Sequence, residues 1–487
     1  MSYEQLDRWS EEAAVGLADR GVGESSVVAL VLPSCPEYTV LYAACAKLGA
    51  ITAGINHRLT PLERDRVVTL AQPDLILSTA DLLDRRESAE LIQPCGYVPA
   101  DSDLADSDLP ESEETEAEVL AGLRVVGGVV APLAEDLDRP ICIVFTSGTT
   151  GTPKGAVFCG RQLQFICQVD TQHTWNSPQD LGLHSSAGTS LTHLGPMTKL
   201  LGNLHSGGTS HLMKKWTALG GLEAVEQFRM PVIAGIPTQL ALMLHHDSFD
   251  QFDLSCVQAV IVGGGPATPA LITEARERLG VPVAVRYSCT EAGIGVGTSF
   301  QDPPEDALES VGRPHLGVEL TIRSETGELL APGKIGEITL KSPAVMSGYY
   351  KDPAASSAAF WPDGAVRTGD LGHLDTAGRL HLVGRSKEMY IRGGNNVYPM
   401  EVESVLSQHG GVAQLVIVPR PDPTMGEVGV AVLVPSDPLN PPTLEELRGF
   451  AAEQIAPFKL PSELVLRDSL PLTPMEKIDR NAIREEL

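Results

Sequence analysis

Hydrophobic and polar residues alternate along the first hundred residues in patterns that predict helices and strands in turn. Residues 3–21 carry apolar side chains at roughly helical spacing and end at a glycine, which predicts a helix with a glycine cap. Residues 26–32 form a short apolar run typical of a strand, and residues 36–48 predict a second helix that ends at Gly49. Alternation of this kind predicts a layered α/β domain with a largely parallel sheet.

The last hundred residues follow an α+β pattern of their own. They predict a helix over residues 399–407, strands over residues 414–419 and 428–434, and a second helix from residue 443 onward. Thr443 and Glu446 have the spacing of a capping box, which marks the start of the second of these helices. The run that begins at Gly384 separates this pattern from the preceding one. We therefore expect an N-terminal domain over residues 1–384 and a C-terminal domain over residues 385–487.

A loop rich in glycine and hydroxyl residues follows a short apolar strand of the N-terminal domain. Residues 141–145 are rich in β-branched side chains and predict a buried strand, after which the sequence reads T-S-G-T-T-G-T-P-K-G. The loop offers hydroxyl groups, permissive glycines and one lysine, contributed by Thr146, Ser147, Gly148, Thr149, Thr150, Gly151 and Lys154. Hydroxyl donors, backbone N–H groups and a mobile positive charge together predict a cradle for polyphosphate.

The spacing of this loop differs from that of the Walker loop, G-x-x-x-x-G-K-[ST]. Thr152 and Pro153 separate the second glycine from Lys154, and Gly155 occupies the position of the magnesium-binding hydroxyl residue. A plain surface turn rich in glycine, serine and threonine is the alternative interpretation of such a loop. Other motifs along the chain must therefore decide between the two.

Composition indicates a globular chain that must hold any polyanionic ligand with locally placed positive charge. The chain has 487 residues, of which 43% are hydrophobic and 20% charged, so two to four domains with sizeable cores are expected. Its longest apolar runs are far shorter than the ~20 residues that span a bilayer, and no charged-then-apolar leader opens it, so we expect a cytoplasmic protein without integral membrane association. The eight cysteines form no C-x-x-C pair, which favours reduced thiols. A net charge of −27 argues against nucleic acids and anionic membranes as partners.

The complete loop, with P-K-G at its end, resembles the phosphate loop of the adenylate-forming superfamily, which includes acyl-CoA synthetases, peptide-synthetase adenylation domains and luciferases. Further segments resemble the same family in order, among them I-N-H-R-L-T-P-L-E, I-V-G-G-G-P, Y-S-C-T-E, T-G-D-L-G-H-L-D, G-R-S-K-E-M-Y-I-R-G-G-N-N-V-Y-P and P-L-T-P-M-E-K-I-D-R. The chain is identified as a member of this family, most like acyl-CoA synthetases. The resemblance implies a large N-terminal domain of layered α/β subdomains with a small barrel-like β subdomain, and a small mobile α+β C-terminal domain.

The resemblance also implies a site for ATP. Its residues would be Gly263, Gly264, Gly265, Tyr287, Ser288, Asp370 and Arg385. The three glycines would lie flat against adenine, Asp370 would accept hydrogen bonds from both ribose hydroxyls, and Arg385 would reach the ribose and phosphate. Ser288 stands where the family usually has glycine, which puts the approach to the acyl carbonyl in doubt.

Four residues would act on the phosphates according to the same resemblance. Thr290 would aim its hydroxyl at the α-phosphate, and Glu291 would hold Mg²⁺, a cation that takes carboxylate oxygen and keeps several waters. Lys477 would bridge the substrate carboxylate and the α-phosphate, and Lys154 would hold the departing phosphates. Glu476 stands where glycine is usual in the family.

Three further features are implied for the acid and the thiol. Lys387 would be the pivot of the C-terminal domain, and Gly393 and Gly394 would line the channel for the pantetheine arm of coenzyme A. His193 and Gly195 would line the acyl pocket, although a structural or surface histidine is the alternative for a lone His193. Since no basic residue near His193 precedes Lys199, we expect a largely apolar or aromatic monocarboxylic acid.

The implied reaction joins a small-molecule carboxylic acid to a thiol in two steps. The acid and ATP give an acyl adenylate and pyrophosphate, and coenzyme A then displaces AMP. Three other readings stay open: a non-adenylating or thioesterification-only member, an amino-acid-activating domain, and a luciferase-like oxygenase. An amino-acid-activating domain would need a carboxylate near His193 for the substrate ammonium, and T-S-L-T-H-L-G offers none. A carrier-protein thiol in place of coenzyme A, and a homodimer, also stay open.

Overall fold

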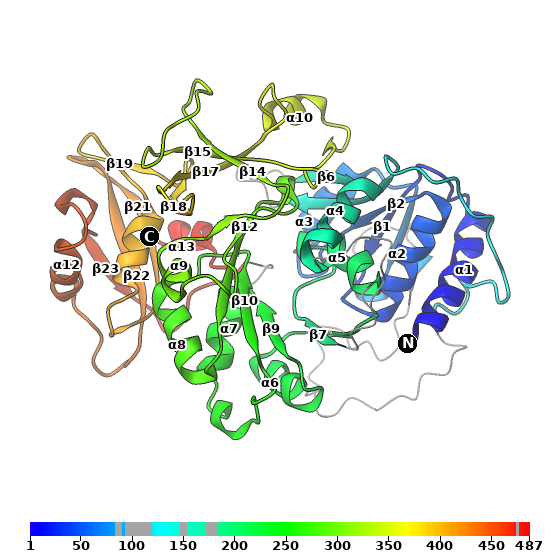
Figure 1. The fold of residues 1–487 in the computed structure, drawn as a ribbon, viewed down its shortest axis with the longest axis horizontal. Helices are drawn as coiled ribbons and strands as arrows, with labels where there is room; N and C mark the ends of the chain where they lie inside the picture. Colours follow the sequence, from blue (N-terminus) through cyan, green and yellow to red (C-terminus); the bar gives the residue numbers. More distant parts are fainter. Residues whose placement is uncertain are drawn as a thin grey trace. The chain divides into compact units, whose positions relative to one another are not determined.

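A computed structural model describes residues 1–82, 90–92, 119–146, 153–171, 183–205, 207–213, 215–473 and 477–487 (Figure 1). The chain divides into two compact units. The first unit comprises Met1–Gly221, Thr290–Gly293 and Pro343–Ala359, and the second comprises Leu222–Cys289, Ile294–Ser342 and Phe360–Leu487. No helix among the described residues combines the length and the apolar character that a membrane span requires.

The first unit is built on a seven-stranded sheet. In spatial order its strands are β16 (Gly348–Tyr349), β6 (Lys154–Cys159), β5 (Pro140–Thr146), β2 (Ile51–Gly54), β1 (Val27–Val31), β3 (Leu75–Ser78) and β4 (Glu90–Leu91). Every pairing from β5 to β4 is parallel, whereas β6 and β16 run antiparallel to their neighbours. The predicted largely parallel sheet is therefore confirmed.

Helices cover both faces of this sheet. The helices of the first unit are α1 (Tyr3–Asp19), α2 (Pro36–Leu48), α3 (Pro61–Ala71), α4 (Gly160–Thr171), α5 (Leu194–His205) and α10 (Pro353–Ala359), with the 3-10 turn η1 (Ala80–Leu82) and a separate strand pair, β7 (His184–Ala187) and β8 (Thr209–Leu212). Val28 and Leu30 of β1 pack with α1 and α2, while Ala29 and Val31 pack with α3 on the other face (Figure 1). Every residue of β1 is buried, as expected for a parallel strand covered on both faces.

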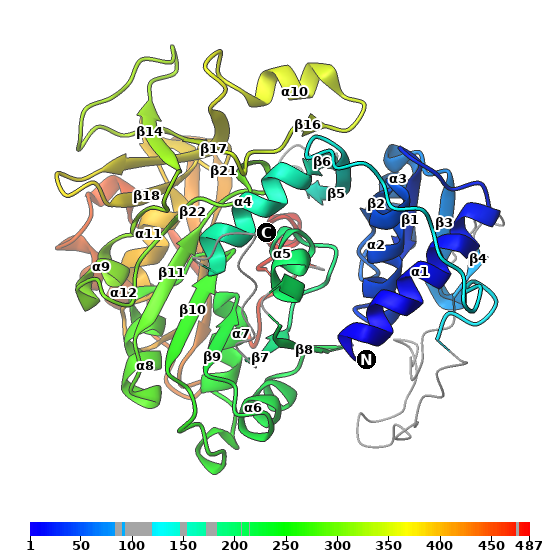
Figure 2. The same ribbon diagram turned by 45° about the vertical axis from the view of Figure 1, so that its right-hand side comes forward.

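The second unit begins with a five-stranded sheet. Its order is β13 (Arg313–Pro314), β12 (Val296–Gly297), β11 (Val283–Tyr287), β10 (Ala259–Gly263) and β9 (Val232–Gly235), as Figure 2 shows for the last three strands. The accompanying helices are α6 (Ala218–Gln227), α7 (Pro237–Leu244), α8 (Pro269–Leu279) and α9 (Pro304–Glu309), with the turns η3 (Phe249–Gln251) and η4 (Thr290–Ala292), the latter in the first unit. Strands β9, β10 and β11 are parallel, so their carboxyl ends meet at one edge.

A four-stranded antiparallel sheet follows in the second unit. Its strands, in order, are β14 (Glu319–Arg323), β15 (Gly336–Lys341), β17 (Val366–Leu374) and β18 (Leu380–Arg385). This sheet corresponds to the small β subdomain that the family resemblance implies. The pairing of β17 with β18 sets Asp370 directly opposite Arg385.

The C-terminal residues form a sheet with a hydrophobic core on each face. The elements are β19 (Tyr390–Arg392), β20 (Asn395–Val397), β21 (Val412–Asp422), β22 (Gly426–Pro435), β23 (Glu463–Leu466), α11 (Pro399–Leu406), α12 (Leu444–Ala452), α13 (Arg480–Glu486) and the turn η5 (Pro457–Lys459). Ile417 and Val416, neighbours on β21, belong to the two different cores. Thr443 caps α12 in a capping box with Glu446, as predicted. The domain boundary at residues 384–385 stays a prediction.

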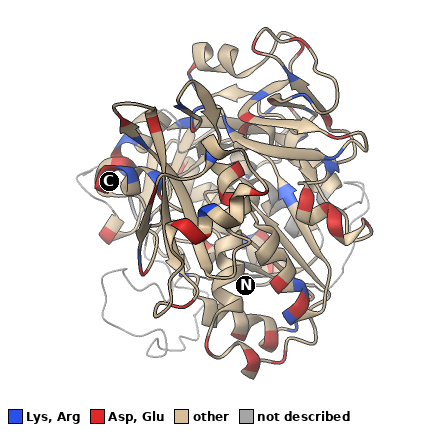
Figure 3. Ribbon diagram, turned by 90° about the vertical axis from the view of Figure 1, so that its left-hand side faces the viewer, with Lys and Arg blue, Asp and Glu red and all other residues tan. Residues whose placement is uncertain are grey.

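Charged residues are spread over both units. In the described part of the chain, acidic and basic residues occur together on the same helices, strands and loops (Figure 3). The acidic segment at residues 101–118 lies outside the described residues.

Candidate functional site

The predicted phosphate loop connects two antiparallel strands of the first unit. Thr146 ends β5, Lys154 begins β6, and the two residues face each other across the hairpin. Gly155 must be a glycine here, because a Cβ at this position would lie 2.5 Å from Cγ2 of Ile143. Five of the predicted loop residues lie outside the described residues, namely Ser147, Gly148, Thr149, Thr150 and Gly151.

Tyr349 links the predicted phosphate lysine to the predicted magnesium ligand within the first unit. The ammonium of Lys154 lies 4.9 Å from the centroid of the Tyr349 ring, within the range of a cation–π interaction. The Tyr349 hydroxyl donates a hydrogen bond of 2.6 Å to Oε1 of Glu291. Lys154 and Glu291, which are far apart in the sequence, thus both contact Tyr349. Tyr349 was not among the predicted site residues.

Glu291 and Thr290 lie in the short 3-10 turn η4. Gly293 ends this turn in a conformation that favours glycine, because its φ is +72° and a Cβ there would lie 2.4 Å from the carbonyl oxygen of Ala344. The backbone carbonyl of Glu291 accepts a hydrogen bond of 2.9 Å from the Met346 amide. The turn is thereby fixed against residues 344–346.

The residues around Glu291 fit a magnesium ion held mainly by nucleotide phosphates. In the described part of the chain, its Oε1 accepts the Tyr349 hydrogen bond and its Oε2 accepts none. No three metal-ligating side chains cluster among these residues. Magnesium sites of nucleotide enzymes use one or two carboxylates plus phosphate oxygens and water, so one accessible carboxylate oxygen is compatible with the expected role.

Three glycines follow the carboxyl end of β10 in the second unit, beside the end of β11. Gly263 pairs with Arg286, and a Cβ at Gly263 would lie 3.0 Å from the Arg286 Cβ and 3.1 Å from its carbonyl oxygen. Gly264 has φ +76°, a conformation that side chains disfavour. At Gly265 a Cβ would make an ordinary contact of 3.5 Å with Pro237. The neighbouring strand thus leaves little room for a side chain at Gly263, and the backbone conformation favours glycine at Gly264. The predicted contact of the three glycines with adenine stays a prediction.

Asp370 is hydrogen-bonded on both carboxylate oxygens. The Tyr287 hydroxyl donates to Oδ2 at 2.8 Å, and Nε of Arg385 donates to Oδ1 at 3.1 Å. Burial and the charge of Asp370 together raise the pKa of Tyr287 well above its usual value. Burial acts to lower the pKa of Arg385, but Asp370, Glu388 and Tyr287 together outweigh it, and the net shift is upward. A carboxylate offers about four acceptor positions, and these two hydrogen bonds occupy one on each oxygen of Asp370.

The charges of Arg385 and Asp370 both affect the pKa of Lys477. Burial, followed by the positive charge of Arg385, lowers the pKa of Lys477, while Asp370 acts in the opposite direction. Lys477 makes two hydrogen bonds with Thr473: its carbonyl accepts from the Thr473 amide at 2.7 Å, and its amide donates to the Thr473 hydroxyl at 3.3 Å. The second unit therefore brings four predicted site residues together, namely Tyr287, Asp370, Arg385 and Lys477. Ser288 follows β11 and donates to the Cys289 carbonyl at 3.2 Å, and Glu476 lies outside the described residues.

The predicted hinge and channel residues lie in turns of the second unit. Lys387 is exposed in the turn after β18. Gly393 and Gly394, with φ +56° and +81°, form the two-residue loop between β19 and β20. Positive φ at both positions is the geometry of a type I′ hairpin turn. The roles of these three residues stay predictions.

His193 and Gly195 lie at the start of α5 in the first unit. The His193 amide donates to the Ser190 carbonyl at 3.0 Å, and its carbonyl accepts from the Met197 amide at 2.8 Å. The His193 side chain is half-buried, and no described atom lies within 4 Å of a Cβ built on Gly195. Their place in an acyl pocket stays a prediction.

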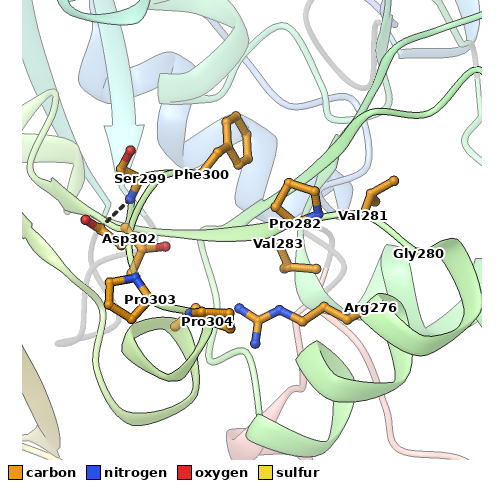
Figure 4. Close-up of a pocket in the computed structure, with 12 residues that line it drawn as sticks. Arg276, Gly280, Val281, Pro282, Val283, Ser299, Phe300, Asp302, Pro303 and Pro304 are labelled. Carbon is orange, nitrogen blue, oxygen red and sulfur yellow. Dashed lines mark hydrogen bonds between the residues drawn. The ribbon is translucent and has the colours of Figure 1, made fainter.

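A pocket of about 390 Å³ lies elsewhere in the second unit (Figure 4). Arg276 from α8 points toward Pro304 beneath Pro282 and Val283, and Phe300 lines the far side (Figure 4). This pocket is at the amino-terminal end of β11, whereas Tyr287 is at the carboxyl end. None of the predicted site residues lines it, so it is separate from the predicted site.

Comparison with known proteins places this geometry in a family. The model of the AMP-binding enzyme family matches residues 1–350, and that of the AMP-binding enzyme C-terminal domain matches residues 401–477. The chain is 32% identical to an indoleacetate–CoA ligase of Aromatoleum aromaticum, covering 100% of this chain and 93% of the relative. It is 30% identical to a feruloyl-CoA synthase of Amycolatopsis, covering 99% and 93%.

Solved structures agree with these relatives. ATP-bound MatB from Rhodopseudomonas palustris is similar with a TM-score of 0.86 and 25% identity, over 100% of this chain and 93% of that one. The amide bond synthetase McbA from Marinactinospora thermotolerans has a TM-score of 0.83 and 27% identity, over 99% and 94%. These likenesses confirm the predicted α/β fold class. With its phosphate-loop hairpin, its Tyr287–Asp370–Arg385 cluster and family matches over most of its length, the chain belongs to the AMP-binding enzyme family.

Proposed function

We propose that this protein is an AMP-forming acid–thiol ligase. Its substrates would be ATP, coenzyme A and an apolar aliphatic or aromatic monocarboxylate, and its products an acyl-CoA, AMP and pyrophosphate. Two relatives at 30% identity or more are named as CoA ligases for indoleacetate and ferulate, both aromatic monocarboxylates. The absence of a basic residue between His193 and Lys199 in the sequence supports an acid with a single carboxylate.

The cluster around Asp370 is the observation that carries the proposal. Tyr287 and Arg385 hold the carboxylate of Asp370 in place, at 2.8 and 3.1 Å, as an acceptor for the ribose hydroxyls. Arg385 and Lys477 add two positive charges, and the pKa of Lys477 is lowered first by burial and then by the charge of Arg385. An acceptor for ribose next to two cations suits a nucleoside phosphate.

The first step activates the acid. A carboxylate resists attack by a thiol because oxide is a poor leaving group. In our proposal a carboxylate oxygen attacks the α-phosphorus of ATP, the bond from that phosphorus to the bridging oxygen breaks, and pyrophosphate leaves. Lys477 offsets the negative charge that gathers between the acid and the α-phosphate, while Lys154 holds the departing phosphates. Positioning and fixed charge are the large contributions in such transfers, so no enzyme nucleophile is required.

Magnesium, when bound, would offset charge on the phosphate oxygens. Glu291 would hold it, since Oε2 of this side chain accepts no hydrogen bond within the described residues. Thr290, in the same turn, would direct its hydroxyl toward the α-phosphate.

The second step transfers the acyl group. The thiolate sulfur of coenzyme A attacks the carbonyl carbon of the acyl adenylate, the carbon–oxygen bond to phosphate breaks, and AMP leaves. We propose that the C-terminal domain rotates about Lys387 between the steps, withdrawing Lys477 and bringing Gly393 and Gly394 to the pantetheine arm.

A turnover screen tests the proposal. The purified protein is mixed with ATP, Mg²⁺, coenzyme A and single acids graded in length and ring content, and pyrophosphate and acyl-CoA are measured. We expect both products with aromatic or apolar monocarboxylates. Preferential turnover of a diacid would overturn the substrate class, and acyl-CoA formation solely from supplied acyl adenylate would indicate a thioesterification-only member.

An amine is the second acceptor to be tested. The likeness to the amide bond synthetase McbA, 27% identical over 99% of this chain, favours including it. The same screen is therefore run with amines in place of coenzyme A. Amide formation without thioester formation would replace the ligase proposal by an amide synthetase.

A further inference from the structure

Tyr349 makes two different polar contacts with its one side chain. Its hydroxyl donates to Oε1 of Glu291 at 2.6 Å, and its ring face receives the Lys154 ammonium at 4.9 Å from the centroid. Glu291 belongs to the turn η4, and Lys154 begins strand β6. The tyrosine therefore joins two elements that come from distant parts of the sequence.

The backbone of Tyr349 is held in register by the sheet. Strand β16 pairs with β6, with Tyr349 opposite Ala156, two residues after Lys154. The Tyr349 amide donates to the hydroxyl of Ser356 at 2.8 Å, and that hydroxyl also donates to the Asp352 carbonyl at 2.7 Å. These contacts fix the position of the Tyr349 backbone, from which its side chain reaches both Lys154 and Glu291.

We propose that Tyr349 is a positioning residue for the metal and phosphate end of the nucleotide. Its hydroxyl holds Oε1 of Glu291, so that Oε2 is turned toward the metal, and its ring holds the Lys154 ammonium in a cation–π contact at the start of β6. The inference rests on the proposed function, because it assigns Tyr349 to the same reaction. Hydrogen bonds that orient a metal ligand commonly contribute 10–100-fold to metal affinity or activity.

The neighbouring tyrosine provides a matched control. Tyr350 also lies beneath a lysine, with the Lys351 ammonium 5.0 Å from its ring centroid, and it packs against the hydrophobic cluster of Ile51 and Ile143. In the described part of the chain its hydroxyl contacts no carboxylate. A Tyr350→Phe variant thus undergoes the same chemical change one residue away without touching Glu291.

Binding measurements separate the two contacts of Tyr349. Mn²⁺, used in place of Mg²⁺, is titrated into protein saturated with a non-hydrolysable ATP analogue, and its affinity is measured by electron paramagnetic resonance. In a second experiment the affinity for the analogue without metal is measured by calorimetry. Tyr349→Phe keeps the ring but loses the hydroxyl, so Mn²⁺ affinity should fall about tenfold or more while metal-free analogue binding changes less than about twofold. Tyr349→Leu should weaken both. Tyr350→Phe should change neither.

A double-mutant cycle tests whether Tyr349 acts through Glu291. In a Glu291→Gln background, Tyr349→Phe should have little further effect on Mn²⁺ affinity. An equal loss in both backgrounds, or unchanged Mn²⁺ affinity in Tyr349→Phe, would overturn the assignment. Failure of the unmodified protein to bind the analogue or to release pyrophosphate would instead overturn the proposed function, so the two failures are distinguishable.

Discussion

Replacing Lys477 by alanine should separate the two steps of the proposed reaction. The structure places Lys477 within the electrostatic influence of Arg385 and Asp370, the cluster assigned to the nucleotide. If Lys477 serves the adenylation step alone, the variant should lose pyrophosphate release but still convert a supplied acyl adenylate with coenzyme A.

The expected size follows from the exposure of the side chain. Two unit charges 4 Å apart interact by about 1 kcal/mol in water and about 4 kcal/mol at an effective dielectric of 20. Lys477 is exposed but partly desolvated, so its contact with a developing charge falls between these limits. About 2.7 kcal/mol corresponds to a rate loss of about 10²-fold, which agrees with the loss of one preorganised donor.

Single-turnover assays measure each step by itself. Pyrophosphate release is followed after mixing with ATP and acid, and thioester formation after mixing with acyl adenylate and coenzyme A. Lys341→Ala is the control, because Lys341 is an exposed lysine at the end of β15 and its loss changes the net charge equally. Equal losses in both steps for Lys477→Ala, or no loss in either, would refute the assignment.

Three further predictions concern pH and backbone geometry. Burial and the charge of Arg385 lower the pKa of Lys477, so Arg385→Gln should move the alkaline limb of the pyrophosphate-release profile upward; an unmoved limb would contradict this. Burial lowers the pKa of His57 to about 4, below its ordinary value of about 6.5. Between these pH values the unfolded state binds more protons than the folded state, so the free energy of unfolding should fall by up to ~3 kcal/mol as the pH drops through that window. Urea unfolding at pH 7 and pH 4.5 should show a smaller fall in the free energy of unfolding for His57→Gln than for the unmodified protein. Gly394→Leu should accumulate acyl adenylate, whereas Gly394→Asn should retain more thioester formation because asparagine tolerates φ +81°. Equal loss of thioester formation in the two variants would contradict a blocked channel and would indicate backbone strain as the cause.

Local rules predicted the elements that depend on neighbouring residues. Gly49 ends α2 with φ +69°, and Thr443 with Glu446 caps α12, because a cap is decided by a few adjacent backbone groups. The strand before the phosphate loop was also predicted, although the loop proves to join two antiparallel strands. Strand ends differ by a residue or two, as for β1, which is Val27–Val31 rather than residues 26–32.

Long-range contacts could not be predicted in the same way. Tyr349 lies 58 residues after Glu291, and nothing in the run Gly348-Tyr349-Tyr350 shows which tyrosine faces a carboxylate. The pairing of β16 with β6 decides this, since neighbouring residues of a strand point to opposite faces. A one-residue shift of register would have exchanged the roles of the two tyrosines.

In the proposed function, the Asp370 cluster would allow a protein of net charge −27 to hold a nucleotide phosphate. Thr368 and Gly369 build the turn, where the Thr368 hydroxyl accepts the Asp370 amide at 3.1 Å and Gly369 has φ +72°. The positive charge comes from outside this motif, from Arg385 on the paired strand and from Lys477. At physiological salt, charges beyond about 8 Å are largely screened, so the acidic remainder of the surface contributes little at the site. Arg385 and Lys477 bring positive charge to Asp370, while Glu388, whose carboxylate lies 4.0 Å from the Arg385 guanidinium, offsets part of it. This local balance, rather than the total charge of the protein, determines whether an anion is held.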